Sequence, residues 1–162
     1  MDSAAAQHPL MGILGKVPSG IYILAAKSGD DETGMLASWV MQAGFEPPML
    51  TVAVKQGRYL ADWLAAGNPF ALNVVAEEGK HLLSHFGRGF ELGQPAFEGI
   101  ATERHATGPL FLTEGVVGYL ICEPKAHTES GDHRIFVAEV IDGQSMSEAR
   151  PMTHIRKTGS GY

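Results

Sequence analysis

Apolar and polar positions along this chain fall into short runs that predict strands more often than helices. In the segment containing Ile21, Ile23 and Ala25, apolar side chains recur at every second position, which places them on one face of a strand. A continuous apolar run such as Met49–Val54 is typical of a buried strand. These patterns predict strands over residues 19–27, 35–42, 49–54, 70–75, 116–123 and 134–141, with a short last strand over 152–155.

Two segments between the early strands have helical spacing instead. Leu60, Trp63 and Leu64 share one helical face, which predicts a helix over 59–66 that ends at Gly67. The other expected elements are short helices over 10–17 and 80–86, a polar turn over 28–34, a proline corner over 44–48 and a glycine-rich loop over 87–109.

The order of these elements favours a mainly β fold. Several strands with two short helices inserted among the early ones suggest a closed antiparallel barrel with a few peripheral helices. A doubly wound fold would need longer helices after nearly every strand, and the chain has no GxGxxG motif. We expect a single domain over residues 1–162, with residues 1–9 as a flexible N-terminal arm.

Composition narrows the class of protein. Of the 162 residues, 44% are hydrophobic and 19% charged, which is ordinary for a globular domain, and 20 glycines with 9 prolines suit many turns. A net charge of −6 gives no basic footprint for nucleic acid. One cysteine excludes an internal disulfide and any CxxC motif. No apolar run is long enough to cross a membrane and no signal peptide is recognisable, so we expect a soluble cytoplasmic protein.

Motifs for nucleophilic and metal-dependent catalysis are weak. The chain lacks a GxSxG elbow, and Cys122 lies inside an apolar strand, where a core role is more common than a nucleophilic one. His81 and His85 have the i, i+4 spacing of two metal ligands, but no glutamate completes HExxH and no third ligand is near in sequence. We therefore expect no metal site.

Three other places could carry chemistry. Gly131-Asp132-His133 enters a strand at an expected barrel rim, where His133 could meet a ligand; in the alternative interpretation, Asp132 only caps a turn. Gly34–Trp39 combines a glycine with small residues, so that its backbone, with the Ser38 hydroxyl, could read the edge of a flat heterocycle. Lys55 and Arg58 straddle a short turn and could bind a phosphate, or could be two solvated cations.

In this order and spacing, the segments resemble the flavin reductase-like, FMN-binding split-barrel domains. The motifs are Gly34-Met-Leu-Ala-Ser-Trp-Val40, then Pro47-Pro48 before an apolar strand, Pro69–Val75 with a central Asn, and Gly131-Asp-His133. Together with His154-Ile-Arg-Lys-Thr-Gly-Ser-Gly-Tyr162, they are most similar to the C-terminal flavin reductase module of cyanobacterial-type flavodiiron proteins. The resemblance extends from about Leu10 to Tyr162.

This resemblance implies a split barrel that forms a homodimer and binds FMN near the dimer interface. His133 would stand where a nicotinamide stacks on the flavin, Val54, Lys55 and Arg58 would lie toward the ribityl phosphate, and Phe86 would close one side. The isoalloxazine would be lined by Met35, Leu36, Ala37, Ser38 and Trp39.

The resemblance also implies an activity, NAD(P)H:flavin oxidoreductase. Electrons from the reduced FMN would pass to a free flavin, to oxygen or to a redox partner of the flavodiiron or rubredoxin type. Two alternatives remain at this point. One is an FMN electron carrier without nicotinamide-dependent activity, and the other is a split-barrel module that binds a different ligand.

Overall fold

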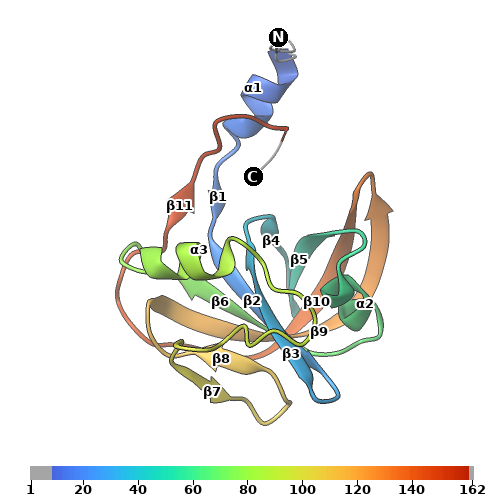
Figure 1. Ribbon diagram of the computed structural model, residues 1–162. Helices are drawn as coiled ribbons and strands as arrows, with labels where there is room; N and C mark the ends of the chain where they lie inside the picture. Colours follow the sequence, from blue (N-terminus) through green and yellow to red (C-terminus); the bar gives the residue numbers. More distant parts are fainter. Residues whose placement is uncertain (1–8, 161–162) are drawn as a thin grey trace.

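One large antiparallel sheet dominates the computed structural model, which describes residues 9–160. Its seven strands run in the order β3-β2-β6-β9-β10-β5-β4 (Figure 1). Residues 1–8 of the expected arm lie outside the described residues. The strands are β2 (Tyr22–Ser28), β3 (Asp31–Ala37), β4 (Val40–Phe45), β5 (Pro48–Lys55), β6 (Phe70–Val75), β9 (Val116–Ser130) and β10 (His133–Ser145).

The two edge strands of this sheet are consecutive in the chain. β3 ends at Ala37 and β4 begins at Val40, so only Ser38 and Trp39 connect the two edges. The sheet must therefore curl until its edges meet at these two residues, which we call the seam. In the described part of the chain no ladder joins β3 to β4. The expected mainly β, antiparallel architecture is confirmed, but the ladder of the barrel stays open at the seam.

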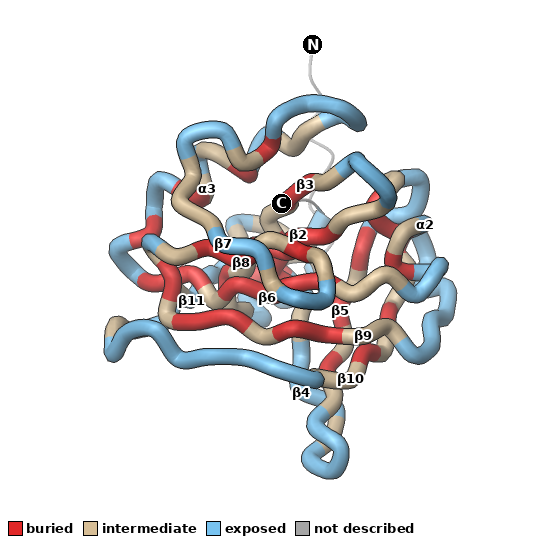
Figure 2. Tube along the Cα trace, turned by 90° about the horizontal axis from the view of Figure 1, so that it is seen from below, coloured by how far each residue is buried: buried red, intermediate tan, exposed pale blue. Residues whose placement is uncertain are grey.

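The described residues form three short helices: α1 (Pro9–Gly15), α2 (Tyr59–Ala65) and α3 (Lys80–Phe86). Only α2 and α3 of these three pack on the sheet. Leu60 and Leu64 of α2 join a buried cluster inside the curled sheet that includes Phe70 and Phe136. Leu82 of α3 joins a second cluster with Ile23 and Val75. Figure 2 shows the buried positions concentrated along the central strands.

Several expected boundaries were wrong. The strand expected over 19–27 is interrupted at Ile21, which separates β1 (Ser19–Gly20) from β2. The polar turn expected over 28–34 is shorter, because β3 already begins at Asp31, and the strand expected over 35–42 is divided by the seam. The loop over 87–109 contains β7 (Thr102–Arg104), which pairs with β8 (Leu110–Leu112). β9 continues to Ser130, well past the expected end at residue 123, and β10 continues to Ser145, past the expected end at 141, because the ladder between them runs from His133↔Ser130 to Ser145↔Gly118.

The two ends of the described chain form an arm that stands away from the sheet (Figure 1). β1 pairs with β11 (Thr153–His154) through Ser19↔His154 and Gly20↔Thr153. Above this pair, the amide of Arg156 donates to the carbonyl of Gly15 at 3.0 Å, and that of Gly159 to Met11 at 2.7 Å. Apolar side chains of α1 thus project from a stalk that both chain ends build.

Candidate functional site

The seam lines a pocket of about 360 Å³ that lies between β3 and α3. One wall consists of the residues that end β3 and form the seam, and the opposite wall comes from Leu83, Phe86 and the turn at Gly87. The pocket gathers most of the candidate cofactor-binding residues of the sequence: Met35, Leu36, Ala37, Ser38, Trp39, Lys55, Arg58 and Phe86.

Backbone groups are available along the β3 wall. Among the described residues, β3 forms a ladder with β2 alone, so alternate N–H and C=O groups on its other edge take no part in a described ladder. At the seam, the carbonyl of Trp39 accepts from the amide of Ala53 at 3.0 Å. An open strand edge of this kind offers donors and acceptors to the rim of a flat heterocycle.

Two cations stand at the end of the pocket. Lys55 is the last residue of β5, and Arg58 precedes the first turn of α2, so the short turn between these elements holds both side chains beside the same space. Both residues are exposed. In the described residues, the Arg58 guanidinium has neither a hydrogen bond nor an ion pair. Uncommitted guanidinium groups bind phosphate oxygens well, because their N–H groups form a planar fork.

Two predicted site residues are placed differently from the expectation. Val54 is 1% exposed and packs in the core, because strand alternation turns Ala53 and Lys55 toward the pocket and Val54 away from it. At Gly34, the close approach is made by Phe86: a Cβ there would lie 2.7 Å from the Phe86 ring. Gly34 therefore admits a buried aromatic side chain against β3.

His133 does not line the pocket but lies directly behind one of its walls. Its imidazole packs against the Trp39 indole, with ring centroids 4.6 Å apart, and it is only 6% exposed. Its Nδ1 is hydrogen-bonded to Asp132 Oδ1 at 2.7 Å, and this bond lowers the pKa of the Asp132 carboxyl. Asp132 thus holds the imidazole, and the imidazole supports the indole.

Sequence reasoning missed several residues of the pocket. His154 of β11 reaches it from the far end of the chain, because β11 pairs with β1 next to the seam. Ala53 could have been found from strand alternation, since it lies two residues from Lys55. No local pattern marks His154.

The buried Asn73 has a structural role: its amide donates to Ile23 O at 2.9 Å and its Oδ1 accepts from Leu112 N at 2.8 Å.

The other chemical candidates do not form sites among the described residues. Cys122 is fully buried, and burial raises the pKa of its thiol to about 12. A thiol that stays protonated in this way is a poor nucleophile and suits a residue of the core. His85 is hydrogen-bonded through Nε2 to Ala96 O at 2.7 Å, and neither it nor His81 belongs to a described cluster of three metal-ligating side chains. No described helix is long and apolar enough to span a membrane.

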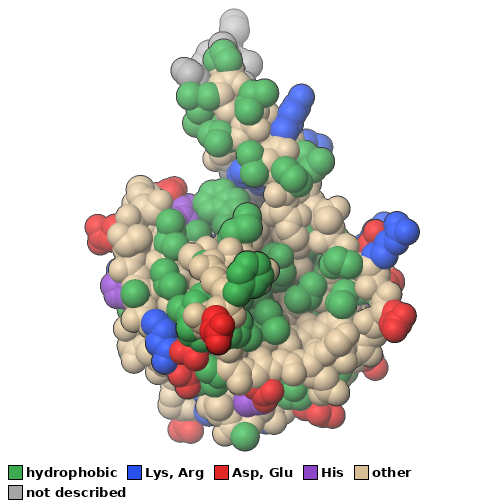
Figure 3. All heavy atoms as spheres, turned by 180° about the vertical axis from the view of Figure 1, so that it is seen from behind, with side chains coloured by type: hydrophobic (Ala, Val, Ile, Leu, Met, Phe, Trp, Pro, Cys, Tyr) green, Lys and Arg blue, Asp and Glu red, His purple; other side chains and the backbone are tan. Residues whose placement is uncertain are grey.

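A second, larger depression lies on the other side of Trp39. This apolar groove of about 1040 Å³ shares Ser38, Trp39 and Ala53 with the pocket. It extends from Leu14 and Val17 at the arm to strand β4, whose Met41 is 69% exposed. Figure 3 shows hydrophobic side chains gathered on α1 and on the face of the molecule below it.

The pocket fits a flavin in its chemistry. An open strand edge and apolar walls suit the flat, partly polar isoalloxazine ring, and two cations at one end suit an anionic phosphate. Gly87 and Gly89 in the loop after α3 leave the pocket without side chains at those positions.

Comparisons with known proteins agree with this chemistry. A family described as "Flavin reductase like domain" matches residues 14–160. Over 152 residues, or 92% of this chain, the sequence is 37% identical to diflavin flavoprotein A 1 of a Synechocystis species. Putative diflavin flavoprotein A 3 of a Nostoc species is 38% identical over the same share. The chain spans 26% of the length of each of these relatives.

Solved structures share the fold. The NADH:FAD oxidoreductase of Streptomyces globisporus C-1027, in complex with NAD and FAD fragments, superposes with a TM-score of 0.80 at 23% identity, covering 91% of this chain and 86% of that one. The styrene monooxygenase flavin reductase of Pseudomonas putida S12 gives a TM-score of 0.74 at 23% identity, covering 89% of this chain and 90% of that one.

Proposed function

The chain belongs to the flavin reductase-like domain family, and from this premise we propose that it is an NAD(P)H-dependent flavin reductase. The observation that carries the proposal is the pocket at the seam, where an open strand edge, apolar walls and two cations surround one space. When bound, the flavin supplies a hydride acceptor and a store of electrons for a later acceptor. The protein's part is to bind, orient and shield the reactants.

Each wall of the pocket has a separate task in this proposal. Lys55 and Arg58 bind the phosphate of FMN, or of the FMN half of a larger flavin. The open edge of β3 holds the ring through backbone groups, and preorganised donors there stabilise negative charge on the reduced ring. Leu83 and Phe86 exclude water from the opposite side. Trp39, supported by His133, positions the nicotinamide of NAD(P)H.

We also propose that two copies of the chain form a homodimer. Four apolar residues of the arm, Leu10, Ile13, Leu14 and Val17, are between 44% and 68% exposed, and the apolar groove lies beside the flavin pocket. An exposed apolar helix and an apolar groove on one chain are complementary surfaces that a symmetric pair would bury. Because the groove and the pocket share Trp39, a second copy would also cover one side of the flavin pocket.

The final acceptor is a free flavin, oxygen or a redox partner protein of the flavodiiron or rubredoxin type. The partner option rests on the diflavin flavoproteins, in which the matched region is about a quarter of a longer chain. The same observation favours one alternative, an FMN electron carrier that receives electrons from a protein instead of from NAD(P)H.

The single cysteine and the absence of an apolar run in the sequence support a cytoplasmic setting.

An absorption spectrum of the purified protein tests the proposal. Added FMN should bind, and anaerobic NADH or NADPH should then bleach the flavin bands. Bleaching by dithionite but not by either nicotinamide would favour the electron carrier. A protein that takes up no flavin would contradict both functions.

A further inference from the structure

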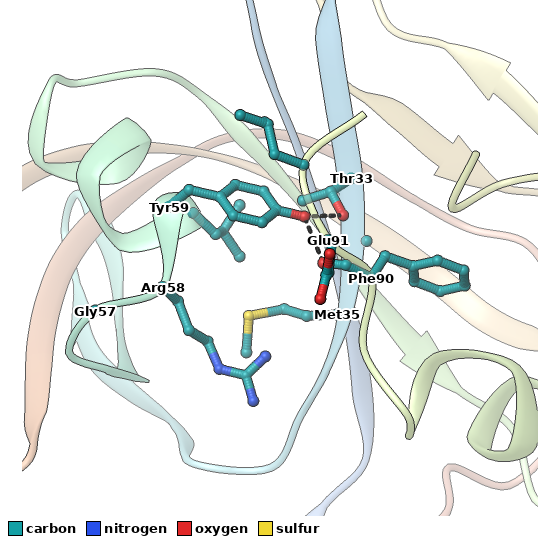
Figure 4. Close-up of a pocket in the computed structure, with 10 residues that line it drawn as sticks. Thr33, Met35, Gly57, Arg58, Tyr59, Phe90 and Glu91 are labelled. Atoms are coloured by element: carbon teal, nitrogen blue, oxygen red, sulfur yellow. Dashed lines mark hydrogen bonds between the residues drawn. The ribbon is translucent and has the colours of Figure 1, made fainter. Parts of the chain in front are cut away.

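The segment that follows α3 forms one side of the flavin pocket and then passes close to α2. Residues 87–91, which we call the strap, contribute Gly87 and Gly89 to the wall of the flavin pocket. Beyond them, Phe90 and Glu91 line a neighbouring cavity of about 270 Å³ between β3 and α2 (Figure 4). Any movement of the strap therefore changes the shape of the flavin pocket.

The strap runs past one of the two cations of the pocket. A Cβ at Gly89 would lie 3.8 Å from Arg58 Nη1, so the backbone of the strap lies close beside the guanidinium. Gly89 has a φ of +74°, which residues other than glycine rarely adopt. Because it has no side chain, the strap can lie over the end of the pocket at which the flavin phosphate is proposed to bind.

On the α3 side, the strap is attached by a main-chain bond and by ring packing. The amide of Gly89 donates to Phe86 O at 3.1 Å. The Phe90 ring packs near the rings of His85 and Phe86, with centroids 5.3 and 6.0 Å apart. The strap is therefore a continuation of the end of α3.

On the α2 side, a single side chain holds the strap. The Tyr59 hydroxyl donates to the carbonyl of Phe90 at 2.7 Å, and its oxygen lies 3.0 Å from Thr33 Oγ1 (Figure 4). Because a carbonyl only accepts and a phenol has one proton, the Thr33 hydroxyl donates to Tyr59 in turn. Among the described residues, no other hydrogen bond or ion pair joins the strap to β3 or α2.

We propose that the Tyr59 hydroxyl is a latch that holds the strap closed beside Arg58 and so sets the rate at which flavin enters and leaves the pocket. This inference rests on the flavin binding proposed above. To open, the strap breaks its bond to Tyr59, and water can then satisfy the freed Phe90 carbonyl. The end attached to α3 serves as the hinge, where Gly89 supplies backbone freedom.

A latch and a ligand contact have different kinetic signatures. Tyr59 does not line the flavin pocket. If the strap opens before flavin passes in either direction, a weaker closed state raises the association and dissociation rate constants by the same factor. Their ratio, Kd, then stays unchanged. Loss of a ligand contact would instead raise mainly the dissociation rate constant.

Stopped-flow fluorescence measures both rate constants for FMN and for riboflavin. Tyr59→Phe removes the hydroxyl but keeps the ring that packs on Trp63, with centroids 5.1 Å apart. We expect both rate constants to rise about fivefold for both flavins with Kd unchanged, because one ordinary hydrogen bond corresponds to about 2- to 10-fold. Thr33→Val removes only the donor to Tyr59 and should cause a smaller rise, about twofold.

Tyr22→Phe is the matched control. Tyr22 is a half-buried tyrosine of β2 that lines the apolar groove, and it lines neither the flavin pocket nor the cavity beside the strap. Removal of its hydroxyl should leave both rate constants unchanged.

Hydrogen exchange of the flavin-free proteins, followed by mass spectrometry, gives a readout that needs no flavin. Peptides covering the strap should exchange about fivefold faster in Tyr59→Phe than in the natural chain, because the same opening exposes their amides. Peptides covering β6 should exchange at the natural rate in both proteins.

The inference is overturned if Tyr59→Phe leaves the two rate constants or the exchange of the strap unchanged. It is also overturned if the variant raises the dissociation rate constant alone, which would make the hydroxyl a ligand contact. In each of these cases flavin still binds, and the proposed flavin reductase function stands. A natural chain that binds neither flavin overturns the proposed function, and this inference with it.

Discussion

The imidazole of His133 packs against the indole of Trp39 with ring centroids 4.6 Å apart. The Arg156 guanidinium also lies over this indole, 5.2 Å from the ring centroid. Trp39 is thus contacted both by β10 and by the tail that follows β11, at the point where the pocket at the seam meets the groove. The orientation of the Trp39 indole therefore depends on His133 and Arg156, neither of which lines the pocket itself.

His133→Ala should slow hydride transfer while nearly preserving FMN affinity. The variant removes the support behind Trp39 but none of the groups that bind the phosphate. Misplacement of a reacting group by about 1 Å can lower a rate by as much as 100-fold, so we expect at least a tenfold loss. Stopped-flow bleaching of bound flavin by NAD(P)H measures the rate.

A packing variant separates two roles of the imidazole. His133→Phe keeps a flat ring against Trp39 and should recover most of the rate if the imidazole only supports the indole. A His133→Ala protein that reduces its flavin as fast as the natural chain would show that Trp39 needs no support.

Arg58→Ala should weaken FMN binding by about 10- to 100-fold, because a charge-assisted contact to phosphate contributes about 1.5–3 kcal/mol. Riboflavin has no phosphate, so its affinity should not change. Fluorescence quenching titrations of both flavins measure the difference. Arg150→Ala is the matched control, since Arg150 is exposed and does not line the pocket. Equal affinities of the natural chain for FMN and riboflavin would refute phosphate recognition.

Ile13→Asp should shift the protein from dimer to monomer. Ile13 is 68% exposed on α1, and a carboxylate there could not be buried in an apolar groove without a large desolvation cost. Light scattering would report about twice 17.3 kDa for the natural chain and 17.3 kDa for the variant. Leu92→Asp serves as the control, because Leu92 is 57% exposed but lies away from the groove. A monomeric natural chain would contradict the proposed homodimer.

Asp142→Asn should lower stability in a pH-dependent way. His105 Nε2 is hydrogen-bonded to Asp142 Oδ2 at 2.6 Å, which lowers the pKa of this carboxyl from its usual 3.8. A carboxyl with a lowered folded-state pKa contributes stability that is complete above its unfolded pKa and is lost as the pH falls through the folded value. Thermal unfolding should therefore show a lower Tm for the variant near neutral pH.

The same experiment in acid provides the check. The difference in Tm between the natural chain and Asp142→Asn should shrink as the pH falls below 3.8, the usual pKa of this carboxyl, and on through its lower folded-state pKa. Asp30→Asn, at an exposed turn position, should cause no comparable difference at either pH. A destabilisation by Asp142→Asn that is equally large in acid would mean that ionisation of this carboxyl is irrelevant.

Much of the fold could be predicted because it depends on local alternation. The strand over 49–54 and the helix over 59–66 lie within a residue of their observed limits, since hydrophobic spacing and Gly67 determine them directly. The seam was not predicted, because Met35–Gln42 is continuously strand-like in sequence and only the curl of the whole sheet divides it. The β7–β8 pair was missed for a similar reason, as three-residue strands carry too little pattern.

The candidate site follows the same division. The residues that end β3 and the two cations lie in local motifs, and the structure gathers them in one pocket. The place of His154 in the pocket and the backing of Trp39 by His133 depend on contacts between distant parts of the chain. Val54 shows the limit of motif reading: the motif includes it, but strand alternation turns its side chain into the core.

The arm built by both chain ends has a consequence for hydrogen exchange. Its β1–β11 ladder pairs only two residues per strand, and the paired residues lie far apart in the sequence. Closing so long a loop costs conformational entropy, and the few contacts of this ladder offset little of that cost. Such a segment opens at low free energy, while the buried part of the long β9–β10 ladder should exchange more slowly. Amides of Thr153 and His154 should therefore exchange early, and each opening would withdraw His154 from the flavin pocket. In the proposed reductase, fraying of the arm would therefore widen one side of the pocket without any rearrangement of the sheet.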